Sequence, residues 1–150
     1  YTTIIWSVKK NIKKYSPILV LDFHEDESTR SFYIYSQGVL GAYDPVAKEV
    51  VAILRDKGFN IRKKGKTGFG EDVINGVVGG VKDGSIDELL GTKYILADGK
   101  LKRKPAAKSV IVIETSTKNM RLETRIKVHS EILLSAEKFF DVAKDVRRKK

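Results

Sequence analysis

The residues best suited to catalysis or metal binding stand together near the start of the chain, where an aliphatic run over residues 18–21 is followed by Asp22 and His24. Alternation along a strand places the side chains of Asp22 and His24 on the same side. Two further carboxylates, Glu25 and Asp26, follow directly. An imidazole among carboxylates can bind a metal ion or transfer a proton near neutral pH, so we interpret His24 as the centre of a candidate site.

A second acidic residue occupies a comparable position much later in the sequence. Glu114 closes the aliphatic run of residues 110–113, much as His24 closes the first run. Open α/β sheets bind ligands just beyond the carboxyl ends of their strands. If the two strands are parallel neighbours, His24 and Glu114 converge on one crevice. That geometry suits a metal ligand beside a general base, because a zinc-bound water needs a carboxylate to take its proton.

The elements that must position these residues alternate between strands and helices. Short apolar or aromatic runs predict strands over residues 18–23, 31–36, 59–62 and 110–113. Capping and periodicity predict helices over residues 2–15, 44–58 and 85–90 and one long helix from residue 122 onwards. Apart from the short helix over residues 85–90, residues 63–108 are expected to form a long segment without regular secondary structure. The chain is therefore expected to be a single α/β domain over residues 1–150, a three-layer sandwich with a parallel or mixed sheet and helices on both faces.

Some candidate residues also have purely structural interpretations. Glu25 and Asp26 form either a solvated acidic turn or auxiliary cation ligands. His129 is expected to be a packing histidine, because it falls within the apolar stripe predicted for the last helix. That stripe consists of Leu122, Ile126, His129, Leu133, Ala136, Phe140 and Ala143.

Composition and charge limit the classes of protein. With 29 Lys and Arg against 19 Asp and Glu, the formal net charge is +10, which fits either a solvated basic surface or nucleic-acid binding. The basic clusters do not interleave with aromatic residues, which favours the solvated surface. The absence of cysteine excludes disulfides, thiolate zinc sites and a cysteine nucleophile, and fits a cytoplasmic protein. The apolar runs are too short to span a membrane.

Two stretches of the chain resemble the zinc carboxypeptidase-like superfamily, nearest to its aspartoacylase and succinylglutamate desuccinylase branch. The first is Leu21-Asp22-Phe23-His24-Glu25-Asp26 with the aromatic strand over residues 31–35, and the second is Ile111-Val112-Ile113-Glu114-Thr115 with the start of the last helix. The resemblance implies that His24 is a zinc ligand and that Glu114 is the general base. It also implies that Asp22 holds the metal-bound imidazole.

The resemblance lacks one essential part. The family's first two zinc ligands come from a His-x-x-Glu motif that lies upstream of the segment resembled here, and this sequence has no histidine before His24 to supply it. A catalytic zinc has three protein ligands, of which His24 is one. Three explanations stay open: the chain is the carboxyl-terminal part of a longer protein, a second polypeptide completes it, or it is a non-catalytic relative.

The resemblance implies a zinc-dependent amide-bond hydrolase of the carboxypeptidase or N-acyl-amino-acid deacylase type, acting on a small amide or peptide. The alternative hypothesis is a non-catalytic binding module with a basic face, which could bind nucleic acid. The missing motif and the net charge of +10 support this alternative.

Overall fold

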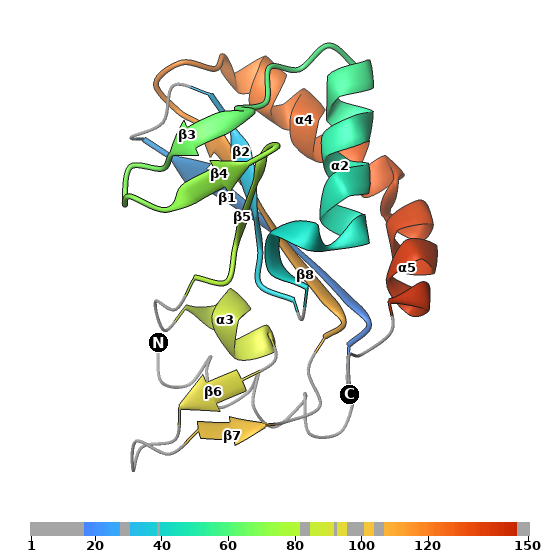
Figure 1. The fold of residues 1–150 in the computed structure, drawn as a ribbon. Helices are drawn as coiled ribbons and strands as arrows, with labels where there is room; N and C mark the ends of the chain where they lie inside the picture. Colours follow the sequence, from blue (N-terminus) through green and yellow to red (C-terminus); the bar gives the residue numbers. More distant parts are fainter. Residues whose placement is uncertain are drawn as a thin grey trace.

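A computed structural model describes residues 17–27, 31–38, 40–81, 85–91, 93–95, 101–103 and 107–146. Its main feature is a mixed six-stranded sheet with the order β1-β8-β2-β5-β4-β3, and β6 and β7 form a separate two-stranded sheet near α3 (Figure 1). The strands are β1 (Leu19–Asp26), β2 (Tyr33–Ser36), β3 (Lys64–Lys66), β4 (Asp72–Ile74), β5 (Val77–Gly79), β6 (Lys93–Ile95), β7 (Leu101–Arg103) and β8 (Ser109–Ser116). The helices are the 3₁₀ turn η1 (Gly41–Tyr43), α2 (Pro45–Asp56), α3 (Ile86–Leu90), α4 (Leu122–Leu134) and α5 (Ala136–Asp145).

Helices α2, α4 and α5 cover one face of the sheet (Figure 1). Their buried side chains pack against residues of β8 and β2 that point the same way, such as Ile111, Ile113 and Ile34. A smaller apolar cluster, centred on Tyr33 and Tyr35, occupies the opposite face. The short helix α3 borders that second face. The α/β fold with a mixed sheet and helices is therefore confirmed.

The capping predictions for α2 and α3 are confirmed. The Asp44 carboxylate accepts a hydrogen bond from the Val46 backbone N–H at 2.8 Å, and Pro45 is the first residue of α2. The Ser85 hydroxyl accepts from the Glu88 N–H at 3.3 Å and begins α3. Both caps satisfy backbone donors that the first helical turn leaves unpaired.

Residues 63–108 are more ordered than the sequence analysis predicts. Three strands of the main sheet, β3, β4 and β5, lie in this stretch, where irregular structure is expected. Each has only three residues, so no alternating pattern develops that would reveal it. Conversely, the strand predicted over residues 59–62 is reduced to one isolated bridge between Ile61 and Phe32.

The last helix is interrupted at Ser135 and becomes α4 and α5. The Ser135 hydroxyl donates to the Glu131 carbonyl at 2.9 Å, a side-chain bond that competes with regular helical pairing. The buried stripe is also displaced from the predicted one: it consists of Val128, Ile132, Phe139, Ala143 and Val146. Of the predicted stripe, Ala143 is buried as expected, whereas Leu122, Ile126, Leu133 and Phe140 are exposed.

The helix predicted over residues 2–15 lies outside the described residues. Within the described part of the chain, every helix is too short or too polar to cross a membrane.

Candidate functional site

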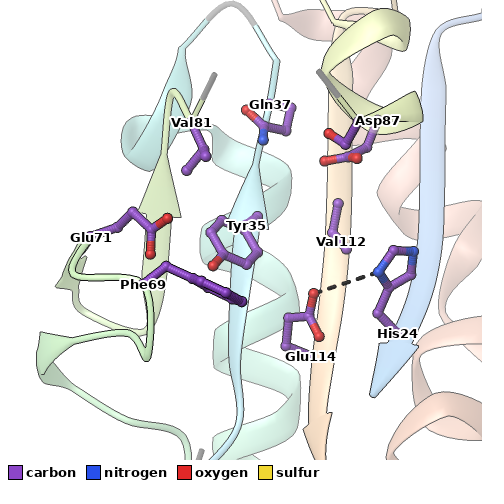
Figure 2. A pocket seen from close by; sticks show the side chains of 10 residues that line it. His24, Tyr35, Gln37, Phe69, Glu71, Val81, Asp87, Val112 and Glu114 are labelled. Carbon is purple, nitrogen blue, oxygen red and sulfur yellow. Dashed lines mark ion pairs between the residues drawn. The ribbon is translucent and has the colours of Figure 1, made fainter. Parts of the chain in front are cut away.

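Strands β1 and β8 bring His24 and Glu114 together. They pair in parallel, and the register sets His24 directly against Glu114. Since side chains of paired residues point to the same face of a sheet, both project to the face that does not carry α2, α4 and α5. Figure 2 shows the imidazole and the carboxylate turned toward each other across the two strands. The condition under which His24 and Glu114 converge, that their strands are parallel neighbours, is therefore met.

The imidazole of His24 lies between two carboxylates. Its Nδ1 is 3.6 Å from Oε1 of Glu114, and its Nε2 is 3.3 Å from Oδ1 of Asp22. The His24 side chain is 48% exposed, whereas that of Glu114 is 12% exposed. One nitrogen of the ring can thus be held by Asp22 while the other faces Glu114.

Burial makes Glu114 an unusual carboxyl group. Removal from water raises its pKa from the ordinary 4.5 to about 7, and His24 opposes part of this rise while Asp26, Asp87 and Asp22 add to it. Desolvation disfavours the charged form of a carboxyl group, which is the physical cause of the largest effect. A carboxyl group with a pKa near neutral pH can both accept and release a proton under physiological conditions.

The acidic residues after His24 divide between the two faces of the sheet. They belong to β1 rather than to a turn, because the strand continues to Asp26. Asp26 accepts a hydrogen bond at 2.9 Å from the hydroxyl of Tyr33, which is two strands away on β2. Glu25 points to the helical face and forms an ion pair with Arg125 of α4. The structure therefore separates Glu25 from His24.

A cavity of about 360 Å³ opens on the side of the sheet that carries His24 and Glu114. Its floor is formed by Val112 of β8 and Tyr35 of β2. Residues from loops and from α3 surround it (Figure 2): Gln37, Phe69, Glu71, Val81, Ser85 and Asp87.

Most residues of this rim have no clear signal in the sequence. Phe69 and Glu71 lie in the connection from β3 to β4, inside the stretch that shows no periodicity. The only local signal is an aromatic residue between two glycines, Gly68-Phe69-Gly70, which marks an exposed loop tip. Asp87 is identified only as part of a capped helix. Non-local pairing of short strands, which no local pattern encodes, brings these residues to the cavity.

A metal ion would need more ligands than the described residues of this cavity supply. Among the described residues, no group of three or more histidine, cysteine, aspartate or glutamate side chains could hold an ion. His129 does not help, because it packs on the helical face, with its ring 5.0 Å from that of Phe23 and its Nε2 3.5 Å from the Thr115 hydroxyl. The described residues therefore supply at most part of a zinc site, with His24 as the imidazole donor.

Two solved structures share this fold. One is a proposed metallopeptidase from Shewanella baltica, with 17% sequence identity, a TM-score of 0.63 and coverage of 94% of this chain and 46% of that chain. The other is a proposed metallopeptidase from Shewanella amazonensis, with 20% identity, a TM-score of 0.65 and coverage of 91% and 44%. Comparison of the sequence with protein-family models and with curated proteins gives no match.

These comparisons establish the fold of the chain and its extent relative to these proteins. The chain has a metallopeptidase-like α/β fold. It spans less than half the length of either structure, so it corresponds to only a part of each.

Proposed function

We propose that this chain carries the general-base side of the active site of a zinc-dependent amide hydrolase of the carboxypeptidase-like type. The observation that carries the proposal is the pairing of His24 with Glu114 on adjacent parallel strands, beside a cavity large enough for a small amide. The likeness to part of two proposed metallopeptidases supports it. The substrate class that we propose is an N-acyl amino acid or a short peptide.

In this proposal Glu114 moves the protons. Its carboxylate takes a proton from the attacking water and passes it to the amine that leaves, so that one group serves both halves of the reaction. Glu114 is suited to both steps because burial brings its pKa to about 7. Zinc, when bound, would supply the positive charge that polarises the substrate carbonyl.

His24 and Asp22 form a unit that presents a metal-binding nitrogen. Asp22 lies 3.3 Å from Nε2 and can accept its proton in a hydrogen bond, which leaves the lone pair on Nδ1, toward Glu114 and the cavity. A carboxylate behind a metal-bound imidazole fixes the tautomer and the orientation of the ring.

The remaining zinc ligands in this proposal lie outside the described residues. The sequence contains only two histidines, and His129 is on the opposite face of the sheet. A further imidazole ligand would therefore come from a second polypeptide or from a segment beyond these 150 residues. Either source fits a chain that spans less than half of the similar structures.

The two histidines offer a matched pair of variants for the first test. We expect His24→Gln to weaken the binding of Co²⁺, a spectroscopic substitute for zinc, at least tenfold, because it removes the imidazole donor. The control His129→Gln removes the imidazole on the other face and should leave Co²⁺ binding unchanged. Equal affinity of both variants and the wild type would exclude His24 as a ligand.

The second test concerns catalysis by the natural form of the protein, with any completing segment or partner present. Glu114→Gln should lower kcat for an N-acyl amino acid by about 100-fold or more, the ordinary contribution of a general base, without loss of Co²⁺ binding. Full activity of this variant would remove Glu114 from the mechanism. Wild-type protein that binds metal and cleaves no amide would instead favour the non-catalytic binding module.

A further inference from the structure

The charged side chains that line the cavity, among the described residues, are carboxylates together with the imidazole of His24. Glu71, Asp87 and Glu114 line it, and no lysine or arginine does so among the described residues. This is the reverse of the whole chain, which has 29 basic residues and a net charge of +10. The described lining residues therefore favour a cation over an anion.

Asp87 is the most buried residue of this set. It is 6% exposed and lines the cavity, and no described residue donates a hydrogen bond or forms an ion pair with its carboxylate. Figure 2 shows it beside Gln37, above Val112 and on the same side of the sheet as Glu114. Asp87 lies in the first turn of α3, and a cationic group in the cavity would be attracted to its carboxylate.

Aromatic rings and a second carboxylate complete this part of the cavity. Tyr35 forms part of the floor, and Phe69, which is 78% exposed, stands at the rim (Figure 2). The faces of aromatic rings attract ammonium and guanidinium groups. Glu71 lies beyond these rings on the same wall, where the hydroxyl of Thr67 donates to its carboxylate.

We propose that Asp87 and Glu71, with Tyr35 and Phe69 between them, form a subsite for a cationic side chain of the substrate, an amine or a guanidinium. The inference rests on the proposed function, because it makes this subsite the specificity pocket of the His24–Glu114 site. It narrows the substrate class to amides of lysine-like or arginine-like compounds.

Binding of three matched probes tests the subsite separately from catalysis. The probes are the Nα-acetyl methylamides of lysine, norleucine and glutamate, which differ mainly in side-chain charge. Calorimetric titration of the full chain without added metal should give at least tenfold tighter binding of the lysine probe than of the norleucine probe, since a charge-assisted hydrogen bond contributes about that much. The glutamate probe should bind most weakly, although the protein as a whole is basic.

Variants of the two carboxylates test whether Asp87 and Glu71 cause the preference for the lysine probe. Asp87→Asn should abolish the preference for lysine over norleucine and leave the affinity for norleucine unchanged, and Glu71→Gln should reduce the preference. Asp56→Asn, an exposed carboxylate at the end of α2, is the control and should preserve it. Equal binding of the three probes to the wild type, or an unchanged preference in both cavity variants, would overturn the subsite. If Asp87→Asn does not fold, the probe series and Glu71→Gln still decide.

The outcomes separate this inference from the proposed function. If the natural form of the protein hydrolyses neutral and cationic amides at equal rates, the proposed hydrolase activity stands and the cationic subsite is refuted. If the chain prefers the lysine probe but no natural form of the protein cleaves an amide, the cationic subsite stands and the proposed hydrolase activity is refuted.

Discussion

The burial of Glu114 should make the stability of the protein fall as the pH rises toward neutrality. In the folded protein its pKa is about 7, against an ordinary value of 4.5. Between these two values the unfolded chain has released the proton and the folded chain still holds it. The folded state therefore binds more protons in this window, and the free energy of unfolding decreases with increasing pH.

The size of the effect follows from the two pKa values. The difference between 4.5 and about 7, at about 1.4 kcal/mol per pH unit, corresponds to about 3 kcal/mol. Glu114→Gln keeps the shape of the side chain and cannot ionise. We therefore expect the variant and the wild type to be similarly stable near pH 4.5, and the variant to be about 3 kcal/mol more stable above pH 7.

Equilibrium unfolding in urea, followed by circular dichroism at several pH values with EDTA present, measures this difference. Other titrating groups are common to both proteins and cancel in the comparison. Glu27→Gln, at an exposed position just after β1, is the control and should follow the wild type at every pH. A gap between Glu114→Gln and wild type that stays constant from pH 4.5 to 8 would refute the assignment of Glu114 as a buried, proton-holding carboxyl.

Three further predictions concern the scaffold. Asp44→Ala should destabilise the fold by about 3 kcal/mol in urea unfolding, because the buried carboxylate caps α2 and also accepts hydrogen bonds from Ser36 and Ser109; a loss below about 1 kcal/mol would contradict this. Gly79→Ala should lower the melting temperature strongly, because the added Cβ would lie 2.1 Å from the backbone N of Ala42, whereas Gly58→Ala, with open space around it, tests the cost of a positive φ alone. Burial lowers the pKa of His129, so the folded state binds fewer protons than the unfolded chain and stability should fall as the pH drops below about 6.5. His129→Leu should lose this part of the pH dependence, and a variant that retains it would disprove the assignment.

Features encoded locally could be read from the sequence. The aliphatic runs that became β1 and β8, the aromatic β2 and the caps of α2 and α3 were all predicted, because each depends on residues within a few positions of one another. The break at Ser135 and the displaced stripe were not predicted. Both apolar sets on the last helices have helical spacing, and only packing against the sheet decides which set is buried.

The sequence by itself determined that an imidazole and a carboxylate would each follow an aliphatic run in a strand, and both strands continue for two residues beyond them. Only the tertiary structure decided that the two strands pair in parallel with His24 against Glu114, and that Glu25 faces away from the site. It also brought Glu71, Phe69 and Asp87 to the same cavity from a stretch without a regular pattern. The physical reason is that strand pairing is non-local: the register between segments about 90 residues apart depends on how the whole core packs, which neighbouring residues do not specify.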